Sequence, residues 1–193
     1  MSSSSGYGLG LRRAAVWGLL WLCAGNAWAW SLQGVHRIVA QTREGQRVDL
    51  GLVEFTPSAG GSFAFKLSWL REPFEDYFLS MREFKCLNGG NEVTCRVPYP
   101  YRQPATVREG DWRWLEHSLL FMFKAPRDFG ADLRNGLYFR LSLTPEGLKG
   151  LPQAIDLNHI SAPPERLDVP PFEDSLCDDI EPGARWLDQL WIL

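Results

Sequence analysis

Hydrophobic residues in this chain fall at every second position within short runs, and Gly, Pro or Asn residues separate the runs. In the segment 137–144, we expect the apolar residues at odd positions to face one way and the residues at even positions, including Tyr138, to face the other. A period of two residues is typical of half-buried strands in antiparallel sheets. The segment 63–69 repeats this pattern, with four residues expected to point inward: Phe63, Phe65, Leu67 and Trp69.

Departures from simple alternation predict further features of a sheet. Every residue of 119–123 is apolar, which is typical of a central strand covered on both faces. The apolar positions of 48–55 change phase beside Gly51, and such a slip predicts a β-bulge or a sharp bend. Turn-forming residues at 43–46 and at 145–147 predict two hairpins.

These segments together predict a mostly β protein. About eight strands in about 125 residues indicate a single antiparallel β-sandwich or a small β-barrel, which we assign to residues 30–160. Within it, 112–117 is predicted to form one helical turn before the central strand. Residues 161–193 are a Pro-rich, acidic tail. At its end, within 183–193, four apolar residues have helical spacing and predict a short C-terminal helix: Trp186, Leu187, Leu190 and Trp191.

The first 29 residues have the three parts of a cleavable signal peptide. Arg12 and Arg13 supply positive charge, an uncharged apolar run follows over 14–25, and small residues occupy both ends of 27–29. A membrane anchor is the alternative, but a spanning helix needs about 20 apolar residues and this run is shorter. The sequence therefore predicts export, with the mature chain beginning near Trp30 and containing no transmembrane segment.

Removal of residues 1–29 would change the formal net charge from −3 to −5, because that segment carries two Arg residues and no acidic residue. An acidic chain argues against nucleic acid and anionic membrane surfaces as partners, since both favour a basic patch. The remaining 164 residues are the size of one domain. The sequence contains no phosphate-binding loop and no dinucleotide fingerprint, so we expect no cofactor.

Three cysteines would remain after cleavage, and two of them are predicted to form a disulfide. If Gly90 and Asn91 form a two-residue turn, Cys86 and Cys95 face each other across a hairpin. Their Cα atoms would then be about 4.5 Å apart, within the range that a disulfide bridges. Export to an oxidising compartment favours the bond. Cys177 has no partner left within the chain. We expect it to be either a buried or idle thiol or the site of a disulfide to a second chain.

The histidines indicate no metal site. His36, His117 and His159 are far apart in sequence, and none has a second ligand at the spacing that zinc sites use. No nucleophile motif is present, so we assign no catalytic residue. The acidic residues at 173–181 lack the alternating pattern of a calcium loop and are read as a solvated tail.

Two segments rich in aromatic residues are candidates for a ligand surface. The segment 74–86 mixes aromatic residues with both signs of charge, and 97–101 displays two tyrosines between prolines. Aromatic side chains with a few fixed polar groups are typical of binding sites. The alternative is that these side chains fill the core. The hypothetical ligand-binding residues are Tyr77, Arg82, Tyr99 and Tyr101.

Four segments resemble a family of exported proteobacterial proteins of unknown function. They are the run from Phe78 to Cys86, the segment Tyr99-Pro100-Tyr101, the segment Asn135-Gly136-Leu137-Tyr138 and the segment Asp156-Leu157-Asn158. The resemblance implies the envelope of a Gram-negative bacterium. It supplies no catalytic residue.

The sequence therefore predicts a periplasmic, non-catalytic module that binds a small ligand or an envelope protein. The alternative is a periplasmic hydrolase that combines His117 or His159 with a nearby carboxylate. A third hypothesis uses the predicted C-terminal helix, with Trp186 and Trp191, as a docking element for a partner.

Overall fold

A computed structural model of the protein describes residues 30–79 and 83–193. The predicted signal peptide, residues 1–29, and the candidate ligand-binding residue Arg82 lie outside the described residues. Within the described part of the chain, no helix is both long enough and apolar enough to cross a membrane.

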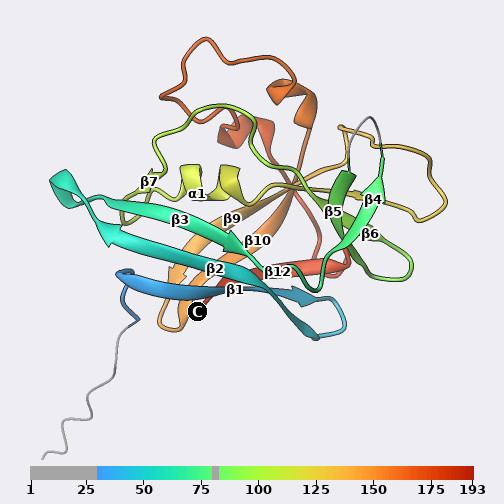
Figure 1. Ribbon diagram of the computed structural model, residues 1–193, viewed down its shortest axis with the longest axis horizontal. Helices are drawn as coiled ribbons and strands as arrows, with labels where there is room; N and C mark the ends of the chain where they lie inside the picture. Colours follow the sequence, from blue (N-terminus) through green and yellow to red (C-terminus); the bar gives the residue numbers. More distant parts are fainter. Residues whose placement is uncertain (1–29, 80–82) are drawn as a thin grey trace, which may run out of the picture.

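In the described residues, twelve strands form one open antiparallel sheet (Figure 1). Eleven strands follow one another in the order β4-β5-β6-β8-β9-β10-β12-β1-β2-β3-β7, and β11 pairs with β10. The strands are β1 (Gly34–Thr42), β2 (Arg47–Pro57), β3 (Phe63–Trp69), β4 (Glu75–Phe78), β5 (Glu83–Asn88), β6 (Val93–Arg96), β7 (Thr106–Val107), β8 (Phe121–Lys124), β9 (Gly136–Thr144), β10 (Gly147–Ile155), β11 (Asp178–Asp179) and β12 (Leu187–Ile192).

The predicted mostly β, antiparallel class is confirmed, whereas the eight-stranded sandwich or barrel is not. Alternation predicts the longer strands well. It does not reveal β7 and β11, because two residues are too short to show a period. The predicted tail, 161–193, contributes β11 and β12 to the sheet.

The sheet curls so that strands distant in its order face each other. Figure 1 shows β1, β2 and β3 crossing in front of β9 and β10. The Trp69 ring on β3 lies 6.2 Å from the Phe121 ring on β8, edge to face. One core cluster fills the inside of the curl, including Ile38, Leu50 and Phe139. A second cluster covers the other face of β5, β6 and β8 and includes the two cysteines of the hairpin.

One α-helix and three 3-10 helices occur in the described residues. The predicted helical turn is confirmed as α1 (Arg113–Ser118), which leads into β8. The central position of β8 is also confirmed, because it pairs with β6 on one side and β9 on the other. The remaining short helices are η1 (Ala59–Gly61), η2 (Leu157–Ile160) and η3 (Asp174–Leu176), all of the 3-10 type.

The predicted C-terminal helix is wrong, because these residues form strand β12 between β1 and β10. A bulge explains the misleading spacing. Thr42 pairs with Leu187 and Gln41 pairs with Gln189, so Asp188 is an extra residue in β12. An extra residue shifts the alternation by one, and Leu187 and Leu190 are therefore both buried although they are three residues apart. The proposed docking role of this segment loses its basis, since the strand is buried within its own sheet.

The predicted bulge beside Gly51 is confirmed. Ile38 pairs with Gly51 and Val39 pairs with Asp49, which leaves Leu50 as the extra residue of β2. Glycine is required here for space, because a Cβ at position 51 would lie 2.5 Å from the carbonyl oxygen of Ser68 on β3.

On β9 the predicted inward and outward faces hold only in part. Tyr138 was expected to face solvent but is 1% exposed, whereas Leu143 is 48% exposed. The chain after η2 covers one end of β9, and Phe172 packs against Tyr138 there. An alternating pattern predicts a strand with one buried face. In β9 the second face is also buried at one end, because a segment that is distant in the sequence covers it.

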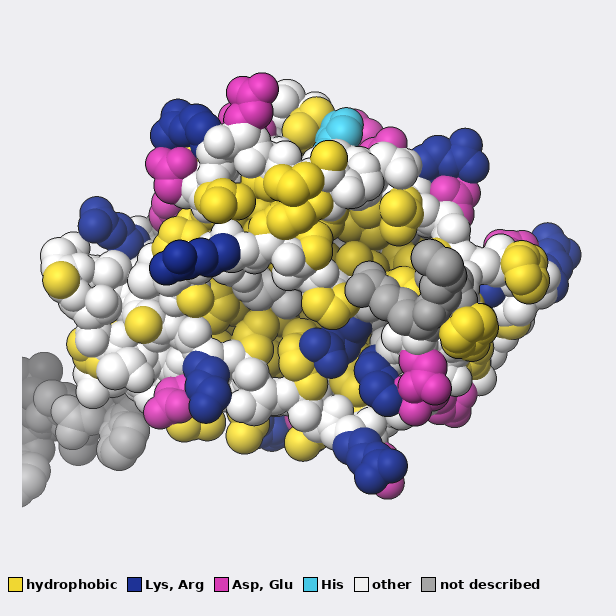
Figure 2. Space-filling view, turned by 45° about the horizontal axis from the view of Figure 1, so that its top comes forward, with side chains coloured by type: hydrophobic (Ala, Val, Ile, Leu, Met, Phe, Trp, Pro, Cys, Tyr) yellow, Lys and Arg dark blue, Asp and Glu magenta, His cyan; other side chains and the backbone are white. Residues whose placement is uncertain are grey.

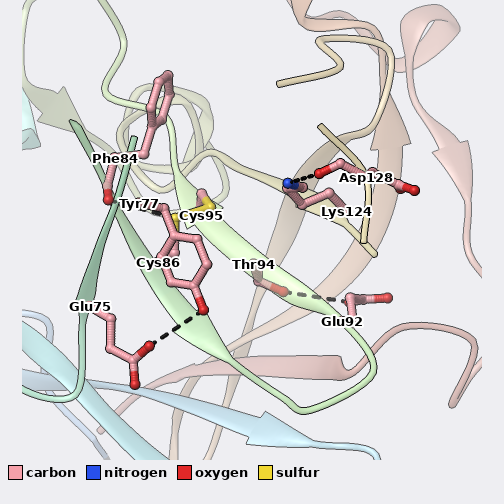
Figure 3. Close-up of a disulfide and its surroundings, with 9 residues drawn as sticks. All are labelled: Glu75, Tyr77, Phe84, Cys86, Glu92, Thr94, Cys95, Lys124 and Asp128. Atoms are coloured by element: carbon pink, nitrogen blue, oxygen red, sulfur yellow. Dashed lines mark hydrogen bonds between the residues drawn. A yellow bond between two sulfur atoms is a disulfide. The ribbon is translucent and has the colours of Figure 1, made fainter. Parts of the chain in front are cut away.

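The disulfide hairpin is confirmed (Figure 3). Cys86 on β5 pairs with Cys95 on β6, with Cα atoms 3.9 Å apart. Gly90 has a φ of +77°, and the Gly89 amide donates to the Glu92 carbonyl oxygen to close the turn. The glycine that begins the turn is what a tight hairpin turn with positive φ requires.

The burial of β12 generates a stability prediction. Leu190 is fully buried, so Leu190→Ala should lower the free energy of unfolding by about 2–5 kcal/mol, the cost of a cavity in a packed core. Gln189→Ala, on the opposite face of the same strand, removes a half-buried side chain and one hydrogen bond from Trp191, and should lower it by about 1 kcal/mol. Urea unfolding of both variants measures the difference. Equal effects would contradict the assigned faces of β12.

The disulfide also makes a quantitative prediction. Replacing both Cys86 and Cys95 by Ala should lower the free energy of unfolding by about 2–3 kcal/mol, because the bond restricts a short loop of the unfolded chain. Cys177→Ala is the matched control for loss of a thiol. Alkylation of the non-reduced, unfolded protein followed by mass spectrometry should leave Cys86 and Cys95 unmodified and should modify Cys177, and modification of Cys86 and Cys95 would refute the bond.

Candidate functional site

The predicted ligand surface is assembled only in part. Tyr99 and Tyr101 contact each other edge to face, with ring centres 5.7 Å apart. Tyr77 lies on the edge strand β4 with its hydroxyl toward Glu75 (Figure 3), and none of the ring contacts among the described residues joins it to the other two tyrosines. The Tyr101 hydroxyl donates to the carbonyl oxygen of Ile160, which holds η2 in place. The structure therefore gives Tyr101 a bond to its own chain.

The aromatic cluster around Tyr99 encloses His117, which is fully buried on α1. The His117 ring lies 6.0 Å from Tyr99, 5.5 Å from Tyr138 and 5.4 Å from Phe172, and the last contact is stacked. Its Nδ1 lies 2.6 Å from the Arg113 carbonyl oxygen, and its Nε2 accepts from the Phe172 amide at 3.0 Å. Both ring nitrogens are therefore used by the main chain.

This arrangement defines the protonation state of His117. Nε2 can accept a hydrogen bond only when the ring is neutral, so Nδ1 carries the proton and donates it to the Arg113 carbonyl oxygen. Burial lowers the pKa of His117 to about 4. A neutral histidine with both nitrogens occupied positions the chain and does not act as a general base. It holds the segment around Phe172 against α1.

Glu116, which precedes His117 on α1, is hydrogen-bonded to strand β9. Its side chain is buried, its Oε2 accepts from the Tyr138 hydroxyl, and its Oε1 accepts from the Leu141 amide at 2.7 Å. Burial raises the pKa of Glu116, and the two hydrogen bonds oppose that rise. These bonds join α1 to β9. A carboxylate has about four acceptor sites, so two remain after these bonds.

Glu116 also lines a cleft of about 780 Å³, which lies between α1, β9 and η3. The volume is within the range of small-molecule sites, about 300–1,000 Å³. Charged side chains dominate its wall. The lining residues are Gly110, Asp111, Trp112, Arg113, Glu116, Arg140, Leu141, Glu173, Asp174 and Ser175.

The two arginines of the cleft already have carboxylate partners. Arg113 forms two hydrogen bonds to Asp111, at 2.8 and 2.9 Å, and this contact lowers the pKa of Asp111. Arg140 on β9 donates to Asp174 at 2.5 Å. Glu173 is exposed and forms no ion pair within the described residues. The cleft therefore has an excess of acceptor groups.

The acidic tail is attached to the sheet through a hydrogen-bonded network. Arg140 Nε donates to Gln153 Oε1 at 2.8 Å, and Gln153 Nε2 donates to Asp179 on β11 at 2.6 Å. The tail was expected to be solvated, yet this network orients two of its carboxylates. Cys177 lies close by, half-buried, and burial raises the pKa of its thiol.

The other described histidines are not hydrogen-bonded to a carboxylate, although His159 lines a hollow with Asp156, Ser175 and Asp178. His159 is exposed at the end of η2, and His36 bonds the Leu32 carbonyl oxygen at 3.1 Å. Across residues 30–79 and 83–193, none of the recorded histidine hydrogen bonds reaches a carboxylate. In the same ranges no group of three or more His, Cys, Asp or Glu side chains is arranged to hold a metal ion.

Comparison with models of known families, with curated proteins and with solved structures finds no match. The function is therefore argued from the geometry of the chain itself.

Sequence reasoning missed the residues that form the cleft. The helical turn at 112–117 and the acids at 173–181 were both recognised, but nothing in the sequence indicates that η3 lies opposite α1. Their contact depends on the Phe172–His117 hydrogen bond, which joins residues 55 positions apart. One useful signal was that Tyr138 and Arg140 both lie on the face of 137–144 that was expected to point outward. If another segment covers that face, such large polar residues need hydrogen-bond partners there.

The burial of His117 predicts how stability depends on pH. Its pKa in the folded protein, about 4, is below the ordinary value of 6.5, so the stability from this group is complete above about pH 6.5 and is lost as the pH falls through 4. Between pH 7 and pH 4 the loss should be about 3 kcal/mol. The His117→Gln variant has no titrating group at this position, so its free energy of unfolding should fall by about 3 kcal/mol less than that of the unmodified protein over the same pH range.

His159→Gln is the control, because it removes an exposed histidine. It should keep the pH dependence of the unmodified protein. Urea unfolding at several pH values gives the slope of the free energy of unfolding against pH. Equal slopes for the His117→Gln variant and the unmodified protein would contradict a buried His117 that stays neutral.

Proposed function

We propose that this protein is an exported, periplasmic, non-catalytic binding module whose cleft between α1, β9 and η3 takes a small hydrophilic ligand rich in hydroxyl and amino groups. The observation that carries the proposal is the composition of the cleft wall. It contains four carboxylates and two arginines, and both arginines are already paired. A ligand that supplies N–H and O–H donors complements such a wall, whereas an anionic ligand does not.

Rigid support of the wall favours binding. Glu116 is held by Tyr138 and by the Leu141 amide, and Arg140 is held by Asp174 and Gln153. Polar groups that are oriented before a ligand arrives lower the entropic cost of binding. The His117 anchor keeps the segment before Glu173 in place, so both sides of the cleft have fixed positions.

Several features support export. The disulfide is typical of proteins from oxidising compartments such as the periplasm. The N-terminal pattern of charge, apolar run and small residues matches a signal peptide. The resemblance to exported proteobacterial proteins points the same way and stays a prediction.

The hydrolase alternative has less support. It requires a histidine within hydrogen-bond reach of a carboxylate or hydroxyl. His117 is committed to two main-chain groups, and in the described residues His159 has no hydrogen bond to a carboxylate.

Binding of glucosamine tests the proposal. The protein should bind glucosamine more tightly than glucose, because the ammonium group adds a charged donor against the carboxylates. Glu173→Gln should weaken glucosamine binding several-fold and leave the fold unchanged, since Glu173 is exposed. Calorimetric titration measures both affinities.

Glu54→Gln on β2 is the matched control, because it removes an exposed acid outside the cleft. Its affinity for glucosamine should equal that of the unmodified protein. If glucosamine fails to bind, or if both variants weaken binding equally, the cleft is not the binding site for this class of ligand.

A further inference from the structure

A cationic side chain without a carboxylate partner lies where the curled sheet meets itself. Arg96 is the last residue of β6, and its guanidinium carbon lies 3.7 Å from the centre of the Trp69 ring on β3. The Phe74 ring centre is 5.7 Å away. Arg96 is half-buried, and burial lowers the pKa of its guanidinium to about 10. No carboxylate within the described ranges pairs with it.

This lack of a partner is unusual for a guanidinium in such a place. The group carries five N–H donors, and none of them is among the buried side-chain atoms that lack a partner in the described residues, so these donors are open to solvent. Stacking on Trp69 supplies a cation–π attraction but does not satisfy the N–H groups, because these point outward in the plane of the guanidinium. An acceptor from outside the chain would satisfy them.

A second positive charge lies beside Arg96. Lys85 precedes Cys86 on β5 and Arg96 follows Cys95 on β6, and these two cysteines pair with each other, so Lys85 and Arg96 flank the same pair. Like charges at such positions repel each other. Lys85 has a carboxylate partner, Asp76 on β4, and Glu83 on β5 adds a second carboxylate to the hollow, whereas Arg96 is paired with neither of them.

Arg96 and Lys85 both line a hollow of about 100 Å³, together with Glu83, Phe84 and Pro98. This volume equals that of about three water molecules, which is room for one carboxylate or phosphate group. Figure 2 shows hydrophobic side chains gathered in a hollow near the middle of one face, with Lys and Arg side chains among them. The hollow around Arg96 shares no lining residue with the cleft beside α1.

We propose that Arg96 and Lys85 form a binding site for a single oxyanion group, a carboxylate or a phosphate, of a ligand that enters this hollow. The Trp69 ring lies against the guanidinium, and a planar guanidinium can donate two parallel hydrogen bonds to one oxyanion. Lys85 adds a second charge from the neighbouring strand. Binding of the oxyanion relieves the repulsion between the two cations.

Titration with inorganic phosphate tests the site. The purified, isotope-labelled protein is followed in nuclear magnetic resonance by the backbone amide signals of residues 83–85 and 95–97, which every variant keeps, with ionic strength held constant by chloride. Arg96→Gln should weaken phosphate binding at least tenfold. Lys85→Gln should weaken it several-fold and is safe for the fold, because Lys85 is exposed.

Two further variants keep the test decisive. Arg96→Lys keeps a charge over Trp69 but loses the planar pair of donors, so it should weaken binding several-fold even if Arg96→Gln misfolds. Lys149→Gln removes another cation that lies over an aromatic ring, 5.2 Å from the centre of Trp191, and should leave phosphate affinity unchanged.

The source of the oxyanion is distinguished by parallel titrations with acetate and with vesicles of phosphatidylglycerol or phosphatidylcholine. Tighter binding to phosphatidylglycerol vesicles than to phosphate, lost in Arg96→Gln and Lys85→Gln, assigns a lipid headgroup. Binding of phosphate or acetate alone assigns a small soluble anion. If no anion shifts the backbone amide signals of residues 83–85 and 95–97, or if the affinity is the same in all variants, the proposal is overturned and Arg96 only joins β6 to β3.

Discussion

The fold depends on the insertion of the last strand, β12, between β1 and β10. In the described residues, this strand is the only link in the order of the sheet between β1–β2–β3–β7 and the strands from β10 to β4. Its buried residues complete the inner core. At the end of the ladder, the Leu193 amide donates to the Arg37 carbonyl oxygen and the Arg37 amide donates to the Leu193 carbonyl oxygen. The two parts of the sheet can therefore face each other only after the end of the chain has returned to its beginning, a contact of high sequence separation.

The segment that leads to β12 connects the sheet to both candidate sites. Phe172 bonds His117, η3 closes the cleft beside α1, and Asp179 bonds Gln153 on β10. Farther along, the Trp186 amide donates to Glu92, and its ring lies over Gly89, where a Cβ would be 2.2 Å from the ring. The disulfide hairpin is thus attached to the tail, so one continuous segment orders the parts that the two proposals use.

Charge is arranged differently at the two sites. In the cleft, each arginine has a carboxylate partner and an excess of acceptors remains. In the hollow at Arg96, a guanidinium is stacked on an aromatic ring and no described carboxylate pairs with it. Complementarity in charge selects ligands more than it adds affinity, so the two sites suit ligands of opposite character.

By itself the sequence determined the local features: the antiparallel strands, the bulge at Gly51, the helical turn before β8 and the hairpin that pairs Cys86 with Cys95. Each depends on residues that are neighbours along the chain, and short-range sterics and hydrophobic periodicity encode such features. Only the tertiary structure decided that 187–192 is a strand, that Tyr138 is buried, and that Glu116 and Arg96 line hollows. These features depend on contacts between segments that are distant in the sequence. Such a contact can bury a residue without altering the local pattern of apolar and polar positions, so the pattern does not reveal it.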